Sequence, residues 1–404
     1  MRRRLIGPAL LILGAVCLGA MASGSRAPWP DSPAEAADPA HFPESAMVLR
    51  GAIGDAIEKG DKQAVAKGAA TLAAMGSGLR PESRARIAPF LDPEQRDALS
   101  RQFDDNVDAV TLSVLEAEIP AEHRIVEGVA WDAKTQRLFA STVIDGRLLV
   151  REGKTWRTVP LQGPVGGLFG MAVDAPRRLL WLTSGLAEQV AKPEKAFRGL
   201  IAVDLDRLTV VRRVPIATGS PGDLAVAADG SVYVSNGETG AIHVCAPGCD
   251  KVQDLLPPGR FRSPQGLAFS RDGKLLYIAD YGYGIAVYDL RRKALSRLAA
   301  AKPAMLDGVD GLVRHKSDLI AIQNGTNPRR IIRLRLGSDG LTVRAIEILG
   351  RSNPDWPEPT LGVIAGDNLL FVADGQWERF GLKGVPIGNA PPKPTPIRAL
   401  RLPN

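Results

Sequence analysis

The sequence predicts an all-β six-bladed β-propeller, preceded by a small all-α N-terminal module and a signal peptide. Three observations favour this fold class. From Thr111 onward, short apolar runs alternate with Gly, Asp-Gly and Pro turns, which is typical of all-β proteins. Six segments of that region share one plan and recur at intervals of 42, 53, 43, 45 and 51 residues, the spacing of propeller blades. Between Pro43 and Val110, alanine-rich segments and helix-start signals predict helices instead.

The composition is that of a globular protein. The chain has 404 residues, 45% of them hydrophobic and 24% charged, which excludes collagen, coiled coils and wholesale disorder. Its 51 Lys and Arg against 44 Asp and Glu give a formal charge of +7. Three of the basic residues lie within residues 1–22, and the others are interspersed with acids, so no patch for nucleic acid is expected.

The N-terminus has the pattern of an export signal. Arg2–Arg4 precede an apolar run that ends in Ala20-Met21-Ala22, a small-x-small cleavage motif. Residues 1–22 are therefore predicted to be a cleaved signal peptide, and the mature protein to be periplasmic or secreted without a membrane span. A retained anchor is the alternative, but three glycines and a proline interrupt the run and make it a poor permanent helix.

A linker and a helical module follow the signal peptide. Residues 23–44 are rich in Pro, Ala, Ser and Asp and are expected to form a flexible linker. Residues 45–110 predict three or four short helices without a catalytic constellation. One helix should begin after Asp92, because an aspartate cap followed by Pro93 suits a first turn. This module is a candidate docking surface for a protein partner.

Residues 111–402 are predicted to form the propeller. The six repeated segments begin at positions 127, 169, 222, 265, 310 and 361, and the unit at Gln265 continues through four strands. The sixth unit lacks a fourth strand, whereas residues 111–119 resemble the outer strands of other units. Pairing of residues 111–119 with residues 396–402 would close the ring and remove two open sheet edges.

Two cysteines remain after removal of the signal peptide. Cys245 and Cys249 are separated by Ala-Pro-Gly, a tight turn that brings them together. In an oxidising compartment this spacing favours a disulfide, and a metal-binding pair is the alternative.

Candidate chemistry is expected in the central channel. The sequence contains no HExxH, paired CxxC, GxSxG or GxxxxGK[ST] motif, which excludes several enzyme classes. The residues that open the six innermost strands should converge on one face of the channel; they are Glu127, Phe169, Gly222, Gln265, Asp310 and Leu361. Two carboxylates among them suit a hard divalent cation such as calcium or magnesium. The alternative is that both are simply solvated at the channel mouth.

Several of these motifs resemble a known family. The runs Val126-Glu127-Gly128-Val129-Ala130-Trp131-Asp132, Ser263-Pro264-Gln265-Gly266-Leu267-Ala268-Phe269 and Val309-Asp310-Gly311-Leu312 are similar to the SMP-30/gluconolactonase/luciferin-regenerating-enzyme-like family, with paraoxonases as distant relatives. The resemblance covers about residues 111–402. It implies a six-bladed propeller with a divalent cation in the channel, and many members hydrolyse lactones or esters.

The resemblance also implies roles for individual residues. Glu127 and Asp310 match metal ligands of the family, and Asp310 also matches its proposed base or proton shuttle. Gln265 stands where the family has an asparagine ligand. The amide oxygen is therefore kept, but it lies one methylene further from the backbone. Gly222 replaces another asparagine ligand and leaves only Asp223 of an Asn-Asp pair.

Other polar residues are expected to line the same mouth. Asp223 follows Gly222 at the opening of the third innermost strand, and the other candidate pocket residues, which follow second strands, are Asn236, Tyr281 and Asn324.

Two functions follow from these patterns. The first is an exported lactone or ester hydrolase that binds a small-molecule substrate in the central channel, uses a cation (Ca²⁺ above all) held by Glu127, Asp310 and Gln265, and moves a proton through Asp310. The second is a non-catalytic binding or scaffold propeller with a degenerate metal site, because a fold does not by itself fix a reaction.

Overall fold

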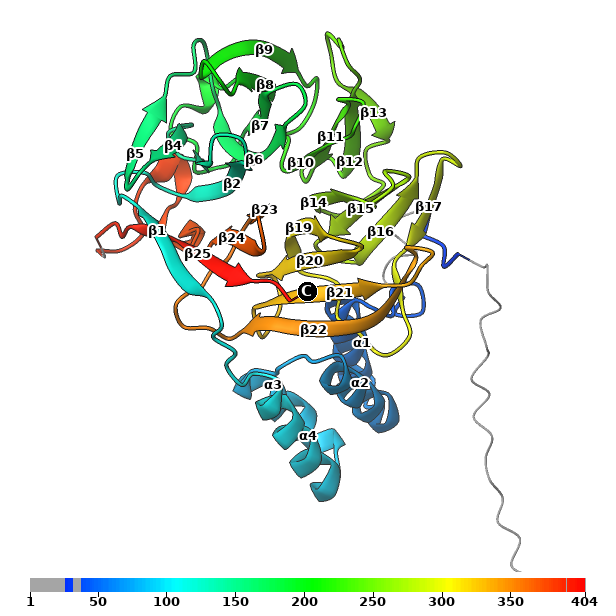
Figure 1. Ribbon diagram of the computed structural model, residues 1–404. Coiled ribbons are helices and arrows are strands. Elements are labelled where there is room, and N and C mark those ends of the chain that lie inside the picture. The colour runs from blue at the N-terminus through cyan, green and yellow to red at the C-terminus, as the bar shows by residue number, and fades with distance from the viewer. Residues whose placement is uncertain (1–25, 32–37, 390, 404) are drawn as a thin grey trace, which may run out of the picture.

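The computed structural model describes residues 26–31, 38–389 and 391–403 and is a six-bladed β-propeller with a helical module at its edge (Figure 1). The predicted fold class is therefore confirmed. The predicted signal peptide, residues 1–22, lies outside the described residues.

The blades are antiparallel sheets that follow one another along the chain. The first three are β2 (Val126–Asp132), β3 (Arg137–Thr142), β4 (Leu148–Glu152) and β5 (Thr155–Val159); β6 (Gly167–Asp174), β7 (Leu179–Gly185), β8 (Gly199–Asp204) and β9 (Thr209–Pro215); and β10 (Leu224–Val226), β11 (Val232–Asn236), β12 (Ala241–Cys245) and β13 (Gln253–Leu256).

The fourth and fifth blades continue the pattern, and the fifth gains a short parallel strand. They are β14 (Pro264–Phe269), β15 (Leu275–Asp280), β16 (Gly284–Asp289) and β17 (Ala294–Arg297); and β19 (Val309–His315), β20 (Asp318–Gln323), β21 (Arg330–Leu336) and β22 (Thr342–Arg351) with β18 (Ala299–Ala300).

The sixth blade combines both ends of the propeller sequence. Its strand order is β23 (Gly362–Ala365), β24 (Asn368–Val372), β25 (Thr395–Arg401) and β1 (Val114–Ile119). β1 and β25 are antiparallel, with Ile119 opposite Thr395. The buried guanidinium of Arg398 adds hydrogen bonds to the hydroxyl and carbonyl of Ser113, at 2.9 and 2.7 Å. The ring is thus closed by a strand that precedes the first blade.

The hydrophobic cores lie between neighbouring blades. One cluster joins Phe139 and Val150 of the first blade to Leu182 and Ile201 of the second, all of them buried. Because each middle strand is covered by a blade on both faces, these strands are apolar throughout rather than alternating. The innermost strands β2, β6, β10, β14, β19 and β23 surround the axis (Figure 1).

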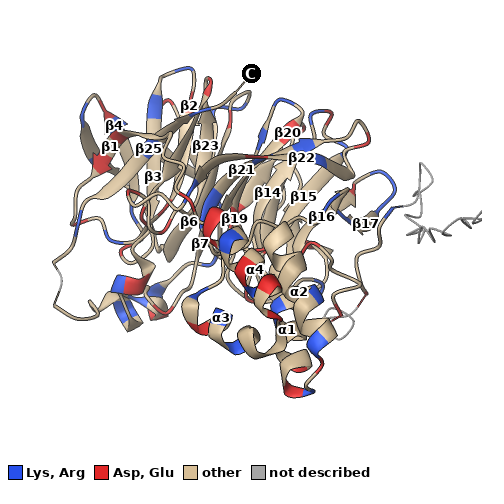
Figure 2. Cartoon of the chain, turned by 90° about the horizontal axis from the view of Figure 1, so that it is seen from below, with Lys and Arg blue, Asp and Glu red and all other residues tan. Residues whose placement is uncertain are grey.

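Four helices form the N-terminal module: α1 (Ala46–Glu58), α2 (Lys62–Ala74), α3 (Pro81–Ile87), continued by the 3-10 turn η2 (Ala88–Phe90), and α4 (Pro93–Asp105). Asp92 caps α4 as predicted, since its carboxylate accepts a hydrogen bond from the Gln95 amide at 2.8 Å and Pro93 occupies the first turn. Basic and acidic residues are mixed over the helices and the blades (Figure 2).

The module is attached to the connection that precedes β19 and to the loop that follows β20, the second strand of the fifth blade. The Asp307 carboxylate accepts hydrogen bonds from the amides of Ala46 and Met47, at 3.0 and 2.8 Å, and so caps α1 from the propeller. The Gly78 amide donates to the Asn327 carbonyl at 2.7 Å. These contacts place the helices beside the face of the propeller where second strands end.

The described parts of residues 23–44 differ from the expected linker. Trp29 and Phe42 are buried with Phe261 and Tyr283 of the fourth blade, and Glu44 forms a buried ion pair with Arg297. Two aromatic rings within a Pro- and Ala-rich sequence supply enough apolar area to dock the segment.

Cys245 and Cys249 form a disulfide at the end of β12, with Cα atoms 5.5 Å apart. We expect thiol labelling of the native mature protein to modify neither cysteine without reductant and both after reduction. Labelling of both residues in unreduced protein would contradict the disulfide. Within the described part of the chain, no helix is both long enough and apolar enough to cross a membrane.

Candidate active site at the channel mouth

The inner strands begin so close together that glycine is needed after the polar opening residues. A Cβ atom at Gly128 would lie 2.5 Å from the carbonyl oxygen of Phe169, on the next blade. One at Gly266 would lie 2.7 Å from the carbonyl oxygen of Asp310. The repeated Gly of the sequence therefore lets neighbouring blades approach at the mouth and brings Glu127, Gln265 and Asp310 around one axis.

Glu127 is held by the last blade. Its side chain is buried, and its Oε2 accepts a hydrogen bond of 2.7 Å from the indole Nε1 of Trp377. Its carbonyl accepts a hydrogen bond of 2.8 Å from the hydroxyl of Thr360. No hydrogen bond to Oε1 occurs among the described residues, so that oxygen is free to meet a ligand.

Asp310 ends a chain of polar side chains. Its Oδ2 accepts a hydrogen bond of 2.6 Å from the Asn324 amide, and the Oδ1 of Asn324 accepts one of 2.9 Å from the Tyr281 hydroxyl. Asn324 and Tyr281, two of the predicted pocket residues, thus orient the carboxylate of Asp310, the residue predicted to be catalytic.

Burial dominates the electrostatics of the mouth. It raises the pKa of Glu127 well above its usual value, and the nearby charge of Asp310 raises it further. Burial also raises the pKa of Asp310, against the hydrogen bond from Asn324. The same cause raises the pKa of Asp223 and of Glu358 to about 7. Carboxyl groups that are close together and shielded from water either keep a proton near neutral pH or are stabilised as carboxylates by a bound cation.

Gln265 and Asp223 lie beside these carboxylates in different ways. The Nε2 of Gln265 donates to the hydroxyl of Ser263 at 2.9 Å, which leaves its Oε1 as an available ligand. A Cβ at Gly222 would lie 3.9 Å from that oxygen, so the space of the absent side chain adjoins Gln265. Asp223 accepts a hydrogen bond from its neighbouring amide, Leu224, at 2.8 Å.

Asn236 is placed apart from this group. Its side chain is fully buried, donates to the Thr218 carbonyl at 3.0 Å and lies 3.1 Å from the ring nitrogen Nε2 of His243. The residue organises a loop rather than facing the carboxylates.

Glu358 is a site residue that the sequence patterns missed. Its Oε2 accepts a hydrogen bond of 2.8 Å from the Trp377 amide, and Trp377 stacks on Phe169 with ring centroids 6.4 Å apart. Glu358 lies in an irregular connection before β23, where strand-end reasoning gives no signal. Trp377 follows β24, the second strand of the sixth blade, and this position is the one sequence feature that suggests it as a site residue.

The donor set fits a hard cation better than zinc. In residues 26–31, 38–389 and 391–403, no group of three or more His, Cys, Asp and Glu side chains is arranged to hold a metal. A cation here would therefore rely on the two carboxylates and on the amide oxygen of Gln265, all oxygen ligands.

A second cavity lies inside the ring of innermost strands. It has a volume of about 380 Å³, and its lining comes from the innermost strands of all six blades. Asp223 and Arg314 are the charged residues among its lining.

Comparison with known proteins shows that the chain is similar in fold to several solved structures. No family model matches the sequence, and no curated protein matches it. Among solved structures, the chain is similar to a gluconolactonase from Xanthomonas campestris, with 19% identity, 74% of this chain and 90% of that chain covered and a TM-score of 0.46. It is also similar to a luciferin-regenerating enzyme, with 15% identity, 72% and 96% coverage and a TM-score of 0.48.

A third neighbour has a different named activity. It is a PQQ-bound aldose sugar dehydrogenase from Streptomyces coelicolor, with 14% identity, 73% and 98% coverage and a TM-score of 0.47. The first two neighbours are of the kinds that the sequence resemblance indicated. At this level of identity the similarity concerns the propeller fold, and the reaction has to be argued from the residues of the channel.

Proposed function

We propose that the chain is a hydrolase of lactones or esters that acts at the channel mouth. The observation that carries this proposal is the pair of neighbouring carboxyl groups of Glu127, which is buried, and Asp310, which is half-buried; they come from the first and fifth blades, and the charge of Asp310 acts on Glu127. Such pairs are maintained against their desolvation cost at sites that move protons or bind cations.

Asp310 is the proposed proton carrier. With Oδ2 held by Asn324, Oδ1 is the oxygen that takes a proton from the attacking water. The water oxygen then bonds to the carbonyl carbon, the carbon–oxygen bond of the ester breaks, and the leaving alkoxide takes the proton back. Tyr281 keeps the Asn324 amide oriented for this role.

A divalent cation, Ca²⁺ in our proposal, would be held by Glu127, Asp310 and Gln265. When bound, it would supply charge stabilisation for the carbonyl oxygen as negative charge develops there. Trp377 fixes Oε2 of Glu127, so Oε1 is the oxygen left for this role. We further propose that the protein acts outside the cytoplasm, which the Cys245–Cys249 disulfide supports.

The proposal predicts that calcium stabilises the protein and supports turnover. We expect millimolar Ca²⁺ to raise the melting temperature, EDTA to reverse the rise, and a screen of aldonolactones and aryl esters to show chelator-sensitive hydrolysis. Gly222→Asn with Gln265→Asn should enlarge the calcium shift, because a Cβ at Gly222 comes no closer than 3.4 Å to its nearest neighbour, Ser235.

The second candidate function is a binding propeller without catalysis, which Gly222 favours because it removes one oxygen ligand from the ring. An unchanged melting temperature with calcium, together with no hydrolysis across the screen, would establish this candidate and reject the hydrolase.

A further inference from the structure

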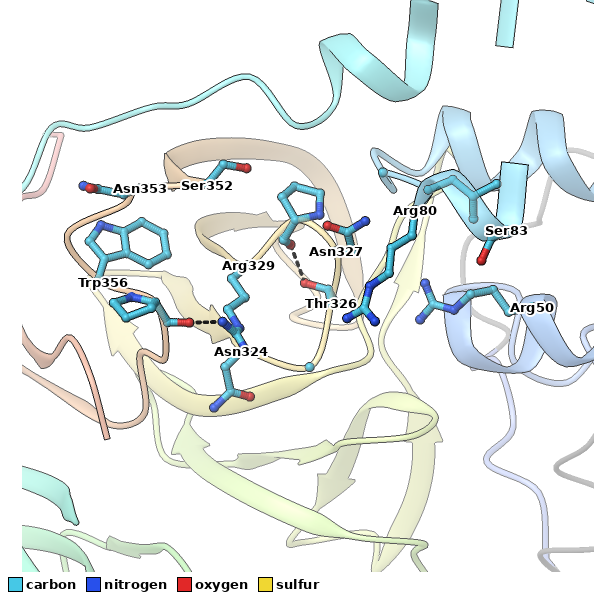
Figure 3. A pocket seen from close by; sticks show the side chains of 15 residues that line it. Arg50, Arg80, Ser83, Asn324, Thr326, Asn327, Arg329, Ser352, Asn353 and Trp356 are labelled. Carbon is cyan, nitrogen blue, oxygen red and sulfur yellow. Dashed lines mark hydrogen bonds between the residues drawn. The ribbon is translucent and has the colours of Figure 1, made fainter. Parts of the chain in front are cut away.

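A polar cavity of about 620 Å³ lies between the helical module and the propeller (Figure 3). Its walls come from the first half of α1, the start of α3, the loop after β20 and the connection after β22. The charged residues among its lining are Arg50, Arg80 and Arg329, and no acidic residue lines it. A volume of this size accommodates a small metabolite.

Within the described part of the chain, two of the three arginines have guanidinium groups without a bonded partner. Among the described residues, the guanidinium groups of Arg50 and Arg80 take part in no hydrogen bond and no ion pair. Both extend from the helical module toward the loop that carries Thr326 and Asn327 (Figure 3). Arg329 donates to the carbonyl of Pro357 and has a loose ion pair of 3.6 Å with Glu378, whose side chain is 82% exposed.

A fourth positive charge, Arg330 at the start of β21, follows Arg329 and lies outside the lining of the cavity. Arg330 is buried, and its guanidinium donates to Gln323 Oε1 at 2.6 Å and to the Met305 carbonyl at 2.8 Å, both neutral acceptors. Burial lowers its pKa to about 10, so it stays charged at neutral pH. The Asp307 carboxylate lies close enough to Arg330 and to Arg50 to interact with both charges, but it does not line the cavity.

We propose that this cavity binds the phosphate or carboxylate group of a small anionic ligand. Arginine suits either group, because its planar fork donates two hydrogen bonds to paired oxygens. Ser83 and Asn327, which also line the cavity, offer further donors beside Arg50 and Arg80.

The cavity adjoins the channel mouth through Asn324. This residue lines the cavity and donates its amide hydrogen bond to Asp310. Arg329 lies near enough to Glu358 to lower its pKa, against the dominant effect of burial. A ligand anchored by the arginines would therefore extend toward the carboxylates. If the proposed hydrolase function holds, on which this step rests, the substrate is an acidic lactone or ester.

Binding can be tested without turnover. We would titrate the full mature protein calorimetrically at low salt with inorganic phosphate, glucose 6-phosphate, glucose and citrate. We expect an anion to bind, glucose not to bind, and affinity to fall as salt is added. Binding of glucose 6-phosphate but not citrate would assign a phosphate group, and the reverse a carboxylate.

Variants then locate the binding. Arg50→Gln with Arg80→Gln should weaken anion binding at least about ten-fold, because charge-assisted hydrogen bonds are lost. The matched control is Arg101→Gln, an exposed arginine on α4 outside the cavity, which should bind like the wild type. Neither replaced guanidinium makes a hydrogen bond or an ion pair within the described residues, so circular dichroism and melting should show the native fold.

Two outcomes would overturn the inference: no anion bound by the wild type up to about 10 mM, or equal affinities for the wild type and the double variant. Hydrolysis of a neutral lactone in that situation would leave the proposed function intact. Conversely, arginine-dependent anion binding without hydrolysis of any ester would uphold the anion site and reject the hydrolase.

Discussion

Asp310→Asn is expected to reduce lactone or ester turnover by about 10²–10⁴-fold, the usual contribution of a positioned acid–base group. Asparagine keeps the size of the side chain and can still accept the hydrogen bond from Asn324, but it cannot take a proton. The measurement is kcat and KM on whichever substrate the screen identifies. The loss should appear mainly in kcat if Asp310 moves protons rather than binding substrate.

Two further variants make this result specific. Glu127→Gln should remove most of the calcium stabilisation, because one carboxylate ligand is lost while Trp377 still has an acceptor. The matched control for Asp310→Asn is Asp367→Asn, which makes the same substitution in the exposed turn between β23 and β24. This variant should keep full activity. Wild-type turnover by the Asp310 variant would exclude it as the proton carrier.

Deletion of residues 111–119 is expected to open the propeller. The sixth blade would lose β1, Ile119 would no longer fill its buried position, and the buried Arg398 would lose both hydrogen bonds to Ser113. We expect the melting temperature to fall by about 10 °C or more and the protein to associate through the exposed edge of β25.

Size-exclusion chromatography and thermal melting check this prediction. The matched control replaces Val114 and Leu115 by Ser, since both side chains are exposed and the backbone pairing is kept. A deletion variant that remains monomeric and melts like the wild type would show that β1 is dispensable for closure.

The fold was predictable because it is repetitive. Each blade carries its own turn and strand signals, so six weak patterns at regular spacing outweigh any single one. The pairing of β1 with β25 could be anticipated from the missing fourth strand of the last unit. The docking of Trp29 and Phe42 on the fourth blade could not, since that contact joins segments more than 200 residues apart and depends on tertiary packing.

The candidate site was predictable only where strands begin or end. Glu127, Asp310 and Gln265 occupy repeat positions, and their convergence follows from the ring. Glu358 lies in an irregular loop, and the arginine cavity combines residues 50, 80 and 329 from two different modules. No local pattern relates such positions, because only the attachment of the helices to the blades brings them together.

Glu127 lies where the first blade meets the sixth blade, and this has a consequence for how the protein is made. Its carbonyl is bound by Thr360, 233 residues later, and its carboxylate by Trp377, 250 residues later. At synthesis rates of about 5–20 residues per second, Trp377 follows Glu127 by roughly 10 to 50 s. Early blades can therefore acquire native strands long before Glu127 reaches its final position. A fragment that ends before Thr360 would contain the strands of the first five blades and would lack both residues that hold Glu127.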